Sequence, residues 1–92
     1  MIDCRETVLI VNKRGLHARA SAKFVNHVAD LPPSVTVTVV KDGTEAAGGS
    51  ILGLMMLGAA KGDRIEIACS GDGADRALAT LASLVREGFG ED

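Results

Sequence analysis

Two segments of this chain alternate polar and apolar residues with a period of two, and this pattern limits the folds that it can adopt. Residues 35–39 alternate valine with threonine, and residues 64–70 place isoleucine and cysteine between polar or small residues. Such alternation is typical of a β-strand that buries one face. A sheet built from these strands needs a second layer on one side only.

One segment with a helical period precedes the first of these strands. Residues 18–29 repeat apolar side chains at intervals of four, as in Ala20, Phe24 and Val28, and a pair of prolines follows shortly after. This spacing predicts an α-helix that buries one stripe of its surface. Such a helix can supply part of the layer that the sheet requires.

A second helix is predicted near the end of the chain. Asp72 is placed to cap it, Asp75 lies in its first turn, and Gly88 follows its last turn. Its apolar face consists of Ala77, Leu78, Leu81, Leu84 and Val85. We expect residues 88–92 beyond this helix to be frayed.

Three shorter elements complete the predicted order. Residues 6–12 predict a first strand, and residues 44–47 follow an Asp-Gly turn as the second arm of a hairpin. Ser50 is placed to cap a short helix over residues 51–57, which Gly58 closes. The order β-α-β-β-α-β-α predicts an α+β fold, a two-layer open-faced sandwich in which three helices cover one face of a four-stranded, mostly antiparallel sheet. The whole chain is expected to form a single domain.

The charge and the aromatic content exclude several kinds of partner. The net charge is -2, and the only aromatic residues are two phenylalanines, so no basic patch with stacking residues predicts a nucleic-acid partner. No apolar run approaches the roughly 20 residues of a membrane span. Asp3, Arg5 and Glu6 near the start are unlike a secretory signal. We therefore expect a cytoplasmic protein without membrane insertion.

The two cysteines, Cys4 and Cys69, do not form a metal-binding pattern. They are far apart in the sequence and have no nearby histidine or carboxylate cluster to complete a site. We interpret both as strand residues, because a reduced buried cysteine packs as a small hydrophobic side chain. A disulfide is the alternative if the first and last strands pair antiparallel, although a reducing cytoplasm disfavours it. No metal or cofactor is expected.

The segment Gly15–Arg19 places a histidine at the start of the first predicted helix and an arginine two residues later. An imidazole has a reference pKa of about 6.5, so a large neutral fraction can attack phosphorus at cellular pH. A phosphoryl group on His17 would face the unpaired N–H groups and the positive end of the helix. Arg19 could then pair with the phosphoryl oxygens, since a guanidinium matches phosphate geometry.

The short helix over residues 51–57 holds more apolar side chains than a helix of that length can bury. Some of them must face solvent, and we predict an exposed docking patch next to His17. The predicted docking residues are Ile51, Leu52 and Met55. Arg14, Arg19 and Lys23 could add a basic rim that faces acidic partners.

Together these segments resemble one known family, the histidine-containing phosphocarrier HPr of bacterial sugar phosphotransferase systems, with its nitrogen-branch relatives. The resemblance covers nearly the whole chain and rests on three landmarks in the same order. They are Gly15–Arg19 after a strand, the run from Ser50 to Gly58, and Gly62 with Asp63 before the last strand. Three landmarks in this context are far more specific than a single five-residue match.

The resemblance implies a relay of phosphoryl groups rather than a turnover enzyme. A phosphoenolpyruvate-dependent kinase, Enzyme I, would phosphorylate the δ nitrogen of His17, and an EIIA-type acceptor protein would then receive the group. Arg19 matches the arginine that steadies the phosphate. Because such carriers meet several partners in turn, we expect a monomer.

Further roles follow from the same resemblance. Ser50 matches a serine that an ATP-dependent kinase modifies in some lineages, so a serine kinase/phosphorylase is a further expected partner. As an N-cap, Ser50 also has a purely structural explanation. Ile51, Leu52 and Met55 match apolar positions that dock the upstream kinase.

The sequence departs from the family at Ala20, where the pattern usually has proline. Proline suits the first turn of a helix because its missing N–H would be unpaired there, and alanine is compatible but less rigid. Two other functions fit the same residues. One is a mainly regulatory nitrogen-branch protein that acts through its phosphorylation state, and the other is a non-phosphorylated binding module in which His17 has no task. His27, inside the first predicted helix, is assigned no role.

Overall fold

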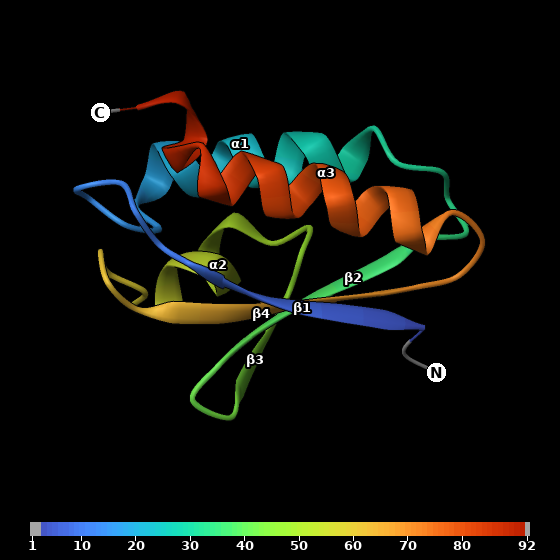
Figure 1. Cartoon of the computed structure of the whole chain (residues 1–92), viewed down its shortest axis with the longest axis horizontal. Helices are drawn as coiled ribbons and strands as arrows, with labels where there is room; N and C mark the ends of the chain where they lie inside the picture. Colours follow the sequence, from blue (N-terminus) through green and yellow to red (C-terminus); the bar gives the residue numbers. More distant parts are fainter. Residues whose placement is uncertain (1–2, 92) are drawn as a thin grey trace.

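The structure is a computed structural model that describes residues 3–91. Within these residues the strands and α-helices follow one another in the predicted order, and a short 3-10 turn, η1, comes last (Figure 1). The elements are β1 (Cys4–Leu9), α1 (Ala18–Ala29), β2 (Thr36–Lys41), β3 (Thr44–Ala47), α2 (Ile51–Met56), β4 (Arg64–Ser70), α3 (Ala74–Arg86) and η1 (Gly88–Gly90).

The four strands form one antiparallel sheet in the order β1-β4-β2-β3. β4 lies between β1 and β2, so that Ile65 is opposite Val8 and Ile67 is opposite Val39. All four of these side chains are buried, whereas Arg64 is exposed. The predicted period of two, with one apolar face, is therefore confirmed.

The helices form the second layer of the fold. α1 and α3 lie side by side over one face of the sheet, and α3 packs against β1 and β4 (Figure 1). α2 packs against α1 and β3. Phe24 from α1, Leu54 from α2 and Leu81 from α3 are buried in the same core cluster as the strand residues. The predicted two-layer α+β architecture is confirmed.

The first strand lies earlier in the chain than the sequence pattern predicts, because it begins at Cys4 instead of Glu6. β1 ends at Leu9 instead of Asn12. The N–H of Ile10 still donates to the carbonyl of Asp63 over 2.8 Å, but the ladder stops there and the chain turns inward. Asn12 is only 1 % exposed. Ile10 and Asn12 are thus buried in the loop that follows the strand, whereas Val11 between them is exposed.

The predicted cap of the last helix is wrong by one residue. The N-cap of α3 is Gly73, whose φ of 94° lies in the left-handed region that favours glycine, and no side chain caps this helix. Asp72 lies outside the helix, one residue before this cap. Asp75 occupies the first turn as predicted, and α3 ends at Arg86, close to the predicted Gly88.

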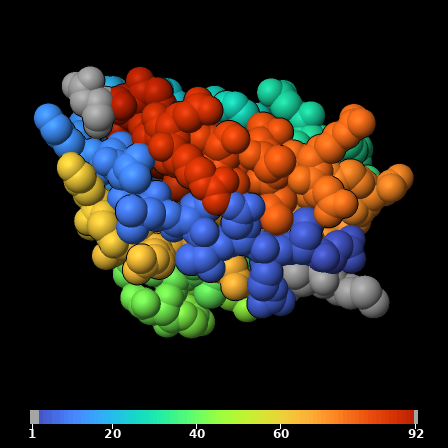
Figure 2. Space-filling model, viewed as in Figure 1, coloured from blue at the N-terminus to red at the C-terminus, as the bar shows by residue number. Residues whose placement is uncertain are grey.

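The segment after α3 is folded, and the expectation that it is frayed is wrong for residues 88–91. Residue 92 lies outside the described residues. Phe89 is 1 % exposed, and its carbonyl accepts a hydrogen bond of 2.6 Å from the Lys23 ammonium. Figure 2 shows this segment, in red, packed against the blue segment that follows β1. This hydrogen bond therefore holds the segment after α3 against α1.

Cys4 and Cys69 face each other across β1 and β4, the arrangement that a disulfide would require. Both are free thiols. Burial raises the pKa of the Cys69 thiol to about 11, and burial together with Asp75 raises the pKa of Cys4. Because the thiolate is the reactive form, these shifts favour inert strand residues, as predicted.

Gly15 fixes the loop before α1 through a close backbone approach. Its φ is 61°, and a Cβ there would lie 2.2 Å from the carbonyl oxygen of Ala59. Gly62 has a φ of 94°, but a Cβ there would have nothing within 4 Å. The two glycines therefore share a left-handed backbone and differ in the space around them.

We expect Gly62→Ala to lower the free energy of unfolding by about 1–2 kcal/mol, the cost of a left-handed conformation. Gly15→Ala should lower it by about 1–3 kcal/mol more, because the added methyl group meets backbone that cannot rotate away. Urea denaturation followed by circular dichroism measures both values. Equal losses in the two variants would contradict the role of the Gly15 contact.

Candidate functional site

His17 is the residue that starts α1. Its backbone is extended (φ −74°, ψ −179°), and its Nδ1 accepts a hydrogen bond of 3.3 Å from the backbone N–H of Arg19. An imidazole at this position lies beside the N–H groups of the first helical turn, which have no partner within the helix. The predicted placement of His17 at a helix start is therefore confirmed.

The loop before His17 is held by four hydrogen bonds, one of which runs within it from the N–H of Gly15 to the carbonyl of Asn12 over 3.2 Å. The Asn12 side-chain amide donates to the carbonyl of Gly15 over 2.8 Å, and the N–H of Leu16 donates to the carbonyl of Ala59 over 2.9 Å. The Ser21 hydroxyl donates to the carbonyl of Leu16 over 3.2 Å. These contacts come from Asn12, from α1 and from the segment after α2, and they fix the backbone that carries the imidazole.

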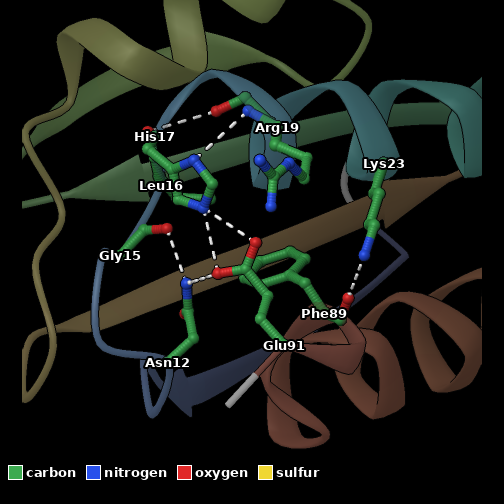
Figure 3. A network of polar contacts seen from close by, with 9 residues as sticks. Asn12, Gly15, Leu16, His17, Arg19, Lys23, Phe89 and Glu91 are labelled. Carbon is green, nitrogen blue, oxygen red and sulfur yellow. Dashed lines mark hydrogen bonds and ion pairs between the residues drawn. The ribbon is translucent and has the colours of Figure 1, made fainter.

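The other ring nitrogen of His17 contacts a carboxylate from the far end of the chain. Nε2 lies 2.9 Å and 2.8 Å from the two carboxylate oxygens of Glu91, as Figure 3 shows. Asn12 Nδ2 donates to the same carboxylate over 2.9 Å. The hydrogen bond from His17, helped by the one from Asn12, lowers the pKa of the Glu91 carboxyl. Glu91 is therefore held in its ionised form.

Sequence reasoning did not find Asn12 or Glu91 as site residues. The sequence pattern places Asn12 at the end of a strand and Glu91 in a frayed terminus. The sequence holds one feature that points to this site. Phe89 is a large apolar residue between two glycines, in the segment that is expected to be frayed. A buried aromatic there would have indicated that the chain folds back after α3.

Basic residues gather beside Glu91, the carboxylate that contacts the imidazole. Lys13, Arg14 and Arg19 line a pocket of about 180 Å³ together with Glu91. The predicted rim of Arg14 and Arg19 is thus brought together, with Lys13 added. Lys23 instead bonds to the carbonyl of Phe89 and anchors the C-terminal segment.

α2 presents the exposed apolar patch that its composition predicts. Leu54 and Leu57 are buried, and Ser50 caps the helix by accepting a 2.9 Å hydrogen bond from the N–H of Gly53. The exposed members, with their exposed fractions, are Ile51 (41 %), Leu52 (67 %), Met55 (40 %) and Met56 (75 %). Met56, the most exposed of these, was not among the predicted docking residues. We call these four residues the α2 patch.

Other candidate sites are not formed by the residues that the structure describes. Among residues 3–91, no three histidine, cysteine or acidic side chains gather closely enough to hold a metal ion. None of the helices in that range is long and apolar enough to cross a membrane. His27 is exposed, and its Nδ1 lies 2.9 Å from the carbonyl of Lys23 on the same helix.

Comparison with known proteins finds close relatives over nearly the full length. Residues 4–87 match a family model described as the PTS HPr component phosphorylation site. The chain is 42 % identical to the phosphocarrier protein HPr of Neisseria meningitidis, over 95 % of this chain and 96 % of that protein. It is 38 % identical to the phosphocarrier protein NPr of Escherichia coli, over 96 % of this chain and 97 % of that protein.

Solved structures of the same kind share the fold. HPr-C-His from Thermoanaerobacter tengcongensis matches with a TM-score of 0.89 and 35 % identity, over 97 % of this chain and 98 % of that one. HPr from Bacillus anthracis matches with a TM-score of 0.83 and 33 % identity, over 89 % of this chain and 95 % of that one. The resemblance seen in the sequence is thereby confirmed, and the chain belongs to the HPr family of phosphocarrier proteins of the phosphotransferase system.

Proposed function

We propose that this protein carries a phosphoryl group on His17, taking it from a phosphoenolpyruvate-dependent Enzyme I and passing it to an EIIA-type acceptor. The observation that carries this proposal is the position of Nδ1 at the open N-terminus of α1, where it accepts the N–H of Arg19. The protein then acts as a transfer intermediate rather than a turnover enzyme. We expect it to work as a cytoplasmic monomer.

The transfer begins when the lone pair of Nδ1 leaves the Arg19 N–H and attacks phosphorus. A bond from Nδ1 to phosphorus forms while the bond from phosphorus to the donor histidine breaks, and that electron pair returns to the donor ring. The Arg19 N–H is then free to donate to a phosphoryl oxygen, and the helix dipole favours the added negative charge. Transfer to the acceptor runs the same steps in reverse.

The cations around the pocket support the same step. Lys13, Arg14 and Arg19 line it together with Glu91, which contacts His17, so positive charge lies close to the ring that would carry the phosphoryl group. Phosphoryl transfer depends mainly on positioning and charge stabilisation. A shallow site on the surface is sufficient for both, and it leaves the phosphoryl group accessible to the next partner.

The α2 patch is proposed as the docking surface for Enzyme I, with Arg14 at its basic margin. α2 packs against α1, and the segment that follows α2 contacts the loop before His17. A partner seated on these apolar side chains would therefore reach the imidazole. A phosphate placed on Ser50 by a serine kinase would add charge at the start of α2 and oppose this docking.

We expect His17→Ala to abolish phosphorylation, because the attacking nitrogen is lost. Incubation with Enzyme I and phosphoenolpyruvate, followed by intact mass measurement, should add one phosphoryl group to the wild type and none to this variant. His27→Ala is the control, since His27 is exposed and lies on the same helix, and it should be phosphorylated like the wild type.

The same assay separates the alternative functions. Supplying a sugar-branch and a nitrogen-branch EIIA to the phosphorylated protein identifies the branch by which acceptor gains the group. A wild-type protein that gains no mass would leave a non-phosphorylated binding module as the function and would overturn the carrier proposal.

Arg19 should contribute to the rate through its guanidinium. Charge-assisted hydrogen bonds of this kind are worth about 1.5–3 kcal/mol, so Arg19→Ala should slow transfer from Enzyme I by about 10- to 150-fold. Arg19→Lys keeps the charge but not the planar pair of donors, and it should recover only part of the rate. Rapid-quench kinetics measures both variants, and full activity of Arg19→Ala would contradict the assigned role.

Two substitutions of Ser50 separate its role as a helix cap from its position beside the proposed docking surface. Both Asp and Asn cap helices as well as serine, so Ser50→Asp and Ser50→Asn should leave the free energy of unfolding within about 0.5 kcal/mol of the wild type. Only Ser50→Asp adds a charge beside the α2 patch. It should raise the KM for Enzyme I about tenfold or more, since an unpaired charge is costly at an apolar interface. An equal KM for the two variants would contradict docking at this surface.

A further inference from the structure

The C-terminal segment is folded so that it delivers one carboxylate to His17. Gly88, Phe89 and Gly90 all have positive φ, of 65°, 58° and 73°, and this left-handed turn reverses the chain after α3. Phe89 is buried, and Lys23 holds its carbonyl. A non-glycine residue in this conformation is uncommon and indicates that the surrounding contacts impose it.

Two hydrogen bonds assign the protons on the imidazole. A carboxylate can only accept hydrogen bonds, so its contacts of 2.9 Å and 2.8 Å require a proton on Nε2 of His17. The backbone N–H of Arg19 can only donate, so its contact with Nδ1 requires a lone pair there. Both contacts select the same tautomer, the one in which Nδ1 is free to act as a nucleophile.

We propose that Glu91 is a positioning residue that holds His17 in the Nε2–H tautomer and stabilises the positive ring formed when Nδ1 takes up a phosphoryl group. This inference rests on the proposed function of His17. It adds a carboxylate that lies beyond the residues matched to the family model.

The Glu91 carboxylate acts on the positive charge that the imidazole gains during phosphoryl transfer. When the Nδ1 lone pair forms the bond to phosphorus, the ring becomes an imidazolium and its proton stays on Nε2. The electron pair of the breaking bond leaves with the donor group. The charge that develops on the ring therefore lies one hydrogen bond from the Glu91 carboxylate, as in a catalytic triad, where a carboxylate orients and stabilises a histidine.

The surroundings of Glu91 make it suited to this task. Its side chain is 16 % exposed, and that of His17 is 13 % exposed, so water screens the pair only partly. Asn12 donates to one carboxylate oxygen and fixes its orientation. The hydrogen bonds from His17 and Asn12, with the nearby charge of Lys23, lower the pKa of the Glu91 carboxyl and keep it charged.

The test compares Glu91→Gln with the wild type and with Glu87→Gln as the matched control. Glu87 is exposed and lies at the end of α3, so the same chemical change is made four residues away. A glutamine at position 91 can accept from Nε2–H or donate to a bare Nε2, so it no longer selects one tautomer. Nitrogen-15 NMR of the imidazole, at an alkaline pH where the ring is neutral, reports the tautomer directly.

The rate is measured with two phosphoryl donors. Enzyme I gives kcat and KM, and phosphoramidate phosphorylates histidine without a protein partner, its phosphorus–nitrogen bond breaking as ammonia leaves with the electron pair. In Glu91→Gln we expect a mixture of tautomers, a fall of about tenfold or more in kcat and in the phosphoramidate rate, and a KM within about twofold of the wild type. Glu87→Gln should match the wild type in every readout.

The possible results are distinguishable. A wild type that neither donor phosphorylates would overturn the carrier function itself. A normally phosphorylated wild type with an unchanged tautomer and rate in Glu91→Gln would overturn the role of Glu91 alone. A slower Glu91→Gln with the wild-type tautomer would overturn the tautomer role and would leave the charge of the carboxylate as its only effect on the rate.

Discussion

The sheet buries one of its faces under helices, and this constraint brings the two ends of the site together. Because α1 and α3 must share that face, they lie side by side, and the turn η1 after α3 contacts α1 (Figure 1). The start of one helix and the end of the other therefore meet at one edge of the molecule. His17 and Glu91, 74 residues apart in the sequence, are within hydrogen-bond distance for this reason.

Asn12 links the loop before His17 to Glu91, and its buried position has a cost in free energy. Its amide donates both to the carbonyl of Gly15 and to the carboxylate of Glu91. Both partners are acceptors, so the amide can only present its nitrogen to them. Its buried Oδ1 then has no hydrogen-bond partner among residues 3–91. An unsatisfied buried oxygen costs about 1–3 kcal/mol, and the two donations by the amide, one of them to a charged carboxylate, offset this penalty.

The parts of the fold that depend on local periodicity could be predicted, and those that depend on distant contacts could not. α1 begins and ends where its period and the following prolines indicate, and β3 and β4 have the predicted bounds. The end of β1 could not be predicted, because the β-branched residues Ile10 and Val11 fit a strand equally well whether or not the ladder continues past Leu9. Likewise, Glu91 carries no local signal, since its role depends on a left-handed turn and on a histidine near the other end of the chain.

The two nitrogens of His17 lie in surroundings of opposite sign. Nε2 faces a carboxylate, which favours a positive ring, and Nδ1 faces the start of a helix, which favours a negative phosphoryl group. Fixed groups thus stabilise both charges of the proposed phosphohistidine without an enclosed pocket. Because Nε2 is occupied by Glu91, the phosphoryl group has a single route onto the ring and the same route off it. In the proposed relay, donor and acceptor would therefore approach the same ring nitrogen in succession.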